Sequence, residues 1–99
     1  MKGEKILRET VISRQAGIIT ADLDGEIAMM SLEKGKYYGL NSVASRIWEF
    51  LDQPVTVQEL TKRLMKEYQV DEDTCFRETS LFLNKLFQEG LISLDFKTF

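Results

Sequence analysis

Few side chains in this sequence could carry out covalent or acid–base chemistry. Cys75 is the single cysteine, and histidine is absent from all 99 residues. The chain therefore lacks the commonest general base, and one thiol can form neither an internal disulfide nor a thiolate metal cluster. We also find no phosphate-binding loop and no convincing pair of catalytic carboxylates. The sequence predicts a protein that is not an enzyme, with no cofactor and no metal site, in which Cys75 is a small buried hydrophobe.

The size and composition are those of one small globular domain. Hydrophobic residues make up 43% of the chain and aromatic residues 10%, which is enough for a single core. No apolar run approaches the roughly 20 residues that span a bilayer, and Met1–Lys5 leads into no apolar signal segment. We expect one domain over residues 1–99, flexible at 1–9 and 95–99, in a cytoplasmic protein with no membrane contact.

The first half of the chain carries strand and turn signals. Gly17–Leu23 and Glu26–Leu32 flank Asp24-Gly25, a dipeptide favoured in two-residue hairpin turns. A second turn leads to a short strand at Tyr37–Leu40, which completes a three-stranded antiparallel meander. Thr10–Arg14 could form a short extra strand.

Three helices follow, each opened by a side chain that can accept a hydrogen bond from the first helical turn. These N-caps are Asn41, Thr56 and Asp71. The third helix ends at Gly90, a residue suited to the left-handed conformation at a helix end. The order β-β-β-α-α-α predicts an α+β fold that resembles a winged helix-turn-helix with its sheet moved to the front.

A set of residues from the third strand to the end of the third helix matches a known family. The set is Lys36–Asn41, Ala44, Ile47-Trp48, Leu51, Thr56–Leu60, Phe82-Leu83, Leu86 and Gly90–Ile92. In these residues the chain resembles the PqqD family, in particular its members in lasso-peptide gene clusters.

The resemblance implies a recognition element for ribosomally made, post-translationally modified peptides (RiPPs). Such a module binds the leader segment of a precursor peptide, which adds a strand to the sheet edge and packs against the third helix. In lasso-peptide systems the module hands the precursor to a papain-like leader peptidase, and a cyclase then closes the ring. The partners that the resemblance implies are the leader, the peptidase and the cyclase, with a radical enzyme of another pathway as the alternative.

The third strand and the third helix supply the candidate leader-binding residues. The third strand of a meander has one unpaired edge whose backbone groups are available to a peptide, and Gly39 would let that peptide come close. On the third helix the candidates form a shoulder beside a core stripe that runs through Cys75, Phe82 and Leu86. The candidates are Lys36, Tyr37, Tyr38, Gly39, Phe76, Arg77, Ser80, Asn84 and Phe87.

Some of these residues have an equally simple structural explanation. Large apolar side chains near the centre of a small domain are usually buried, so we expect Tyr38 and Trp48 to belong mainly to the core. Tyr37 fits the groove and the opposite strand face equally well. Phe76 and Phe87 could merely widen the core face of their helix.

Nucleic-acid binding is the main alternative function, because a winged helix-turn-helix ordinarily places a helix in the major groove. The net charge of −3, and five acidic residues against Arg77 and Lys85 between Asp71 and Glu89, would repel phosphates. We therefore expect no nucleic-acid partner. An adaptor that binds only a folded enzyme stays open, and so does a homodimer paired through the exposed strand edge.

Overall fold

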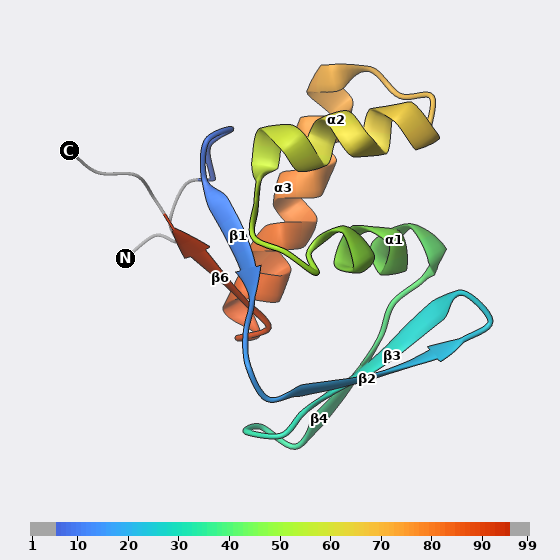
Figure 1. Cartoon of the computed structure of the whole chain (residues 1–99), viewed down its shortest axis with the longest axis vertical. Coiled ribbons are helices and arrows are strands. Elements are labelled where there is room, and N and C mark those ends of the chain that lie inside the picture. The colour runs from blue at the N-terminus through green and yellow to red at the C-terminus, as the bar shows by residue number, and fades with distance from the viewer. Residues whose placement is uncertain (1–5, 96–99) are drawn as a thin grey trace.

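Within residues 6–95, which are those that the computed structural model describes, two small antiparallel sheets and three helices build the fold (Figure 1). The predicted flexibility of residues 1–5 and 96–99 lies outside the described residues. At the borders of this range, Ile6 is buried and Asp95 ends the last strand. The α+β class and the meander followed by three helices are confirmed, but the element order is more complex than predicted.

The meander consists of β2 (Ile18–Leu23), β3 (Glu26–Ser31) and β4 (Lys36–Gly39), in the spatial order β2-β3-β4. The hairpin between β2 and β3 turns at Asp24 and Gly25, whose φ angles are 57° and 86°. Positive φ at both turn residues is what a two-residue hairpin of this kind requires. In Figure 1 the meander lies below the helices, with the β2–β3 turn at the right.

The helices are α1 (Ser42–Phe50), α2 (Val57–Glu67) and α3 (Glu72–Gln88). Each starts after its predicted N-cap: the side chains of Asn41, Thr56 and Asp71 accept backbone N–H bonds of 2.9, 3.1 and 3.0 Å. Gly90, with φ of 77°, closes α3 in the left-handed conformation. No helix among residues 6–95 is long and apolar enough to cross a membrane.

A second sheet joins the two ends of the described chain. Its strands are β5 (Val55–Thr56), β1 (Val11–Arg14) and β6 (Ile92–Asp95), in the order β5-β1-β6. The extra strand expected at Thr10–Arg14 is therefore present as β1. Its pairing with β6 was not predicted, because the partners are far apart in the sequence and no local signal links them. In Figure 1 these two strands lie together at the left, beside α3.

One hydrophobic core joins the inner face of the meander to the helices and to the second sheet. Trp48 of α1 lies within it and is 2% exposed, which confirms the expected burial of this side chain. The Arg14 guanidinium lies 4.7 Å from the centroid of the Trp48 ring, so β1 covers one side of the indole. From the meander, Ile27 and Met29 are buried in the same core.

We predict that Trp48→Ala lowers the free energy of unfolding by ~3–5 kcal/mol, because the substitution leaves a cavity in the core. Urea denaturation measures the effect. Tyr37→Ala is the matched control, since Tyr37 is 79% exposed; its cost should stay below ~1 kcal/mol. Equal unfolding free energies for the two variants would contradict the assignment of Trp48 to the core.

Candidate functional site

The outer edge of β4 is unpaired. In the part of the chain that the structure describes, β4 pairs with β3 alone. The Leu40 N–H donates to the Ile27 carbonyl over 2.8 Å, and antiparallel pairing alternates from residue to residue. The backbone groups of Tyr38 therefore also face β3, whereas the N–H and C=O groups of Tyr37 and Gly39 point outward, where a further strand could bond to them.

A cleft of about 500 Å³ runs between this edge and α3. The strand side is formed by Lys36, Tyr38, Gly39 and Leu40, and the helix side by Phe82, Lys85, Leu86, Gln88 and Glu89. Unpaired backbone groups and a helix face that carries both apolar and charged side chains thus border the same space. This arrangement can hold an extended peptide, since a strand edge provides hydrogen bonds and a neighbouring helix provides side-chain contacts.

One polar contact bridges the cleft near the end of α3. The Tyr38 hydroxyl donates to Glu89 Oε1 over 2.9 Å, and Lys36 Nζ lies 3.5 Å from the same oxygen. The hydrogen bond from Tyr38, followed by the nearby Lys36 charge, lowers the pKa of the Glu89 carboxyl. Partial desolvation raises the pKa of the Tyr38 phenol, and its bond to Glu89 raises it further. Glu89 is therefore held as a carboxylate at this end of the cleft.

Three of the strand residues predicted for the site, Lys36, Tyr38 and Gly39, line the cleft. Tyr38 combines both expected roles, because its ring packs against the core while its hydroxyl reaches Glu89. Tyr37 points to the opposite face of the sheet. A Cβ atom at Gly39 would meet no atom within 4 Å, so the space beside this residue is open.

The helix residues predicted for the site do not line the cleft. They are Phe76, Arg77, Ser80, Asn84 and Phe87. At about 3.6 residues per turn, Phe76 and Phe87 fall on the opposite side of α3 from Lys85 and Glu89. The Arg8 guanidinium lies 4.3 Å from the Phe76 ring centroid, so the N-terminal segment covers that side. This face does not border the strand edge, and the sequence does not reveal that Arg8 packs against it. A leader-binding role for these five residues stays a prediction.

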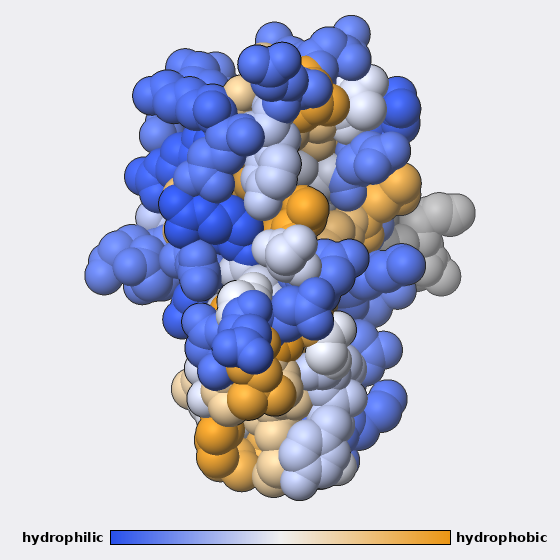
Figure 2. Space-filling view, turned by 90° about the vertical axis from the view of Figure 1, so that its right-hand side faces the viewer, coloured by the Kyte–Doolittle hydropathy of each residue, from blue (hydrophilic) through white to orange (hydrophobic). Residues whose placement is uncertain are grey.

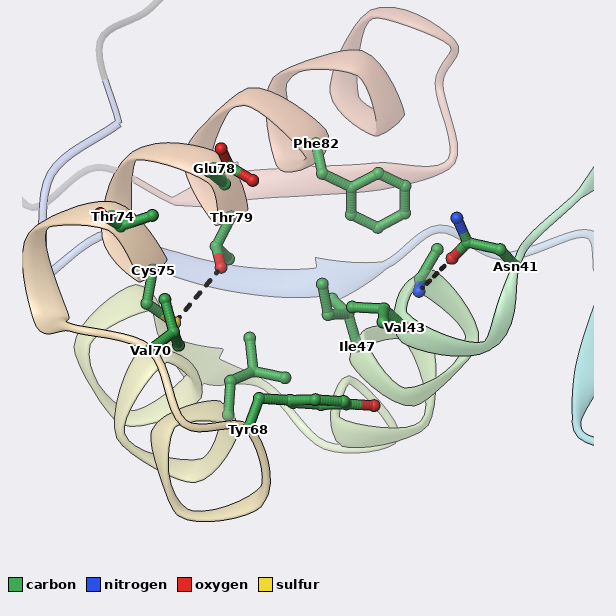
Figure 3. A pocket seen from close by; sticks show the side chains of 12 residues that line it. Asn41, Val43, Ile47, Tyr68, Val70, Thr74, Cys75, Glu78, Thr79 and Phe82 are labelled. Carbon is green, nitrogen blue, oxygen red and sulfur yellow. Dashed lines mark hydrogen bonds between the residues drawn. The ribbon is translucent and has the colours of Figure 1, made fainter.

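A second hollow of about 270 Å³ lies between α1 and α3 (Figure 3). Figure 3 shows Val43 and Ile47 of α1 facing the α3 side chains, with Tyr68 along one wall. Phe82 lines both this pocket and the β4–α3 cleft, so the two hollows adjoin. The sequence placed Phe82 in the core stripe, and its periodicity could not show that one side of the ring faces a pocket.

The outer face of the meander is apolar and exposed. Ile19, Met30 and Tyr37 lie side by side across β2, β3 and β4. Ile19 is 54% exposed, Leu23 on the same face 64% and Tyr37 79%. Orange and tan surface gathers over this part of the molecule in Figure 2. A contiguous apolar face of this kind is typical of a protein–protein contact surface.

Comparison with known proteins gives two kinds of match. The family model described as "Coenzyme PQQ synthesis protein D (PqqD)" matches residues 26–92. A similar solved structure is "TbiB1 in Complex with the TbiA(beta) Leader Peptide", with a TM-score of 0.79 and 29% identity over 87% of this chain and 99% of that chain.

A further solved structure, "Lasso peptide synthetase B1 complexed with the leader peptide", has a TM-score of 0.73 and 22% identity over 83% of this chain and 96% of that chain. This second likeness supports the fold. No curated protein matches the chain. The family match extends from the first residue of β3, through all three helices, to the first residue of β6. It covers well over half of the sequence, and the chain therefore belongs to the PqqD family.

Proposed function

We propose that this protein binds the leader segment of a ribosomally synthesised precursor peptide, which adds as a fourth strand to the free edge of β4. The observation that carries the proposal is the cleft beside that edge, where the backbone groups of Tyr37 and Gly39 point outward. Strand addition satisfies such groups without regard to sequence, so it supplies affinity. The two similar structures described above are complexes with leader peptides, which supports the proposal.

Selection among peptides must come from side-chain pockets, because backbone pairing is indifferent to sequence. The pocket between α1 and α3 is lined largely by apolar side chains and adjoins the cleft at Phe82. A leader that continues past Gly39 would reach this pocket with an apolar side chain. We therefore propose as contact residues Lys36, Tyr38, Gly39 and Phe82, together with the backbone groups of Tyr37. The cleft geometry gives no support to Phe76, Arg77, Ser80, Asn84 and Phe87.

The role we propose is binding without catalysis. Cys75 is 6% exposed, and its Sγ lies 3.9 Å from both the Thr61 carbonyl oxygen and Thr79 Oγ1. With no histidine in the chain, no imidazole can activate this thiol as a nucleophile. The protein would then act as a peptide chaperone that presents a substrate to separate enzymes.

We propose a lasso-peptide pathway rather than a radical-enzyme pathway, because one of the two similar structures is described as a lasso peptide synthetase B1. A leader peptidase and a cyclase are then the expected downstream partners. The same edge would serve a radical enzyme equally well. The identity of the neighbouring genes distinguishes the two pathways. A short precursor gene beside genes for a peptidase and a cyclase would support the lasso pathway.

We propose the outer face of the meander as the docking surface for the leader peptidase. Ile19 and Met30 present apolar atoms next to Tyr37, which belongs to the leader-binding strand. A leader strand paired with β4 would extend the same face from three strands to four. An enzyme seated there would contact the protein and its substrate together, which places the peptide at the enzyme without covering the leader-binding edge.

Homodimerisation through the β4 edge stays a prediction for the protein without leader. The leader and a second copy would compete for the same backbone groups of Tyr37 and Gly39. A bound leader should therefore keep the protein monomeric at this edge.

Hydrogen exchange tests the strand addition. On addition of a synthetic copy of the cognate leader peptide, the amides of Tyr37 and Gly39 should exchange slower by roughly tenfold or more. The amides of Tyr38 and Leu40 are an internal control, since they already bond to β3 and should change little. Protection gained instead at Ile18, on the free edge of β2, would contradict the proposal.

Charge insertion tests the docking face. Ile19→Lys should reduce peptidase cleavage of the precursor by roughly tenfold or more, because it places an ammonium in an apolar contact. The affinity of the Ile19→Lys variant for the leader should stay within about twofold of that of the parent protein, since β2 lies two strands from the binding edge. Thr20→Lys, on the same strand but the opposite face, is the matched control. Equal cleavage rates for the two variants would show that the face does not dock the enzyme.

A further inference from the structure

Positive charge gathers at one end of the β4–α3 cleft. Lys36 of β4 and Lys85 of α3 line the cleft from opposite sides. Lys34, from the turn before β4, reaches the same end, since its Nζ lies 3.7 Å from where a Cβ on Gly90 would stand. The chain as a whole has a net charge of −3. Three lysines around one end of the cleft therefore make a local positive charge on a protein that is negative overall.

A carboxylate of the protein itself already lies among these lysines. Glu89 Oε1 accepts the Tyr38 hydroxyl and faces Lys36 Nζ. Lys34 adds to the positive field that lowers the pKa of this carboxyl. Among the ion pairs formed by residues 6–95, none involves Lys34 or Lys85, so two cations of the group can pair with an anionic ligand.

We propose that this end of the cleft is a carboxylate subsite, which selects leaders carrying an Asp or Glu side chain beside Lys36 and Lys85. In the free protein Glu89 occupies part of the subsite and competes with the incoming side chain. The inference rests on the proposed leader binding and adds a specificity element to it. Glu89 shows the chemistry directly, because a phenol and an ammonium already converge on one carboxylate oxygen at this place.

The solvent exposure of the charged side chains determines how much the subsite should change leader affinity. The side chains of Lys36 and Glu89 are roughly half exposed, so each charge contact is individually modest and sensitive to salt. A bound peptide would cover the cleft and exclude water, which strengthens the attraction. We expect three- to tenfold tighter binding of an acidic leader at low ionic strength, and most of this preference should disappear at high ionic strength.

Binding of matched peptides to the parent protein is the first arm of the test. The probes are a synthetic copy of the cognate leader peptide and further copies in which each Asp or Glu is replaced singly by Asn or Gln. One replacement should weaken binding three- to tenfold at low salt and little at high salt. A leader that binds with no sensitivity to any replacement, or that has no acidic residue, overturns the subsite alone. A leader that does not bind at all overturns the proposed function, and the subsite with it.

Protein variants give the second arm. Lys85→Gln should weaken binding of the acidic leader three- to tenfold. It should not change binding of the copy whose single Asn or Gln replacement weakened binding to the parent protein. Lys62→Gln, on the exposed face of α2, should change the affinity for neither peptide. Glu89→Gln should tighten binding of the acidic leader, because it removes the competing charge, and should leave binding of the amide copy unchanged. Glutamine can still accept the Tyr38 hydrogen bond, which preserves the bridge. Equal weakening of both peptides by Glu89→Gln would show a structural latch and overturn the proposal.

Discussion

Every backbone N–H and C=O group must form a hydrogen bond with a partner or with water. On the outer edge of β4 these groups have no partner strand among the described residues, so they are available to another chain. The register with β3 turns the groups of Tyr37 and Gly39 outward. The helix that runs beside the edge offers side chains and cannot complete a ladder. The cleft is therefore shaped for an extended chain, and the pockets beside it only refine which chain enters.

The rest of the fold keeps that edge accessible. α3 packs against α2 and β6, and Arg8 covers its Phe76 side, while Lys85 and Leu86 on another side line the cleft beside β4. The left-handed turn at Gly90 carries the chain from α3 into β6. The contact between Tyr38 and Glu89 then ties the end of the helix to the strand without filling the space between them. Strand and helix thus form two walls of one binding groove.

Local features were predictable from the sequence, and long-range ones were not. The N-cap at Asn41 and the turn at Asp24-Gly25 depend on a few adjacent residues, and both were predicted where the structure has them. The pairing of β1 with β6 depends on contacts between distant segments, so periodicity alone could not reveal it. The face that α3 turns toward β4 depends likewise on contacts with distant segments, such as that of Arg8 with Phe76. Of the predicted site residues, Lys36, Tyr38 and Gly39 line the cleft, whereas Phe76 and Phe87 do not. The roles of all five in leader binding stay predictions.

The central claim is that a leader peptide becomes the fourth strand of the meander. Isotope-filtered NOE spectroscopy of the labelled protein with an unlabelled leader tests it most directly, because it detects which protons of the two chains are close. The account predicts intermolecular NOEs from the leader backbone to the amides of Tyr37 and Gly39, together with contacts to the Phe82 ring. NOEs confined to the β2 edge, or to Phe76 and Phe87 with the β4 amides untouched, would contradict it.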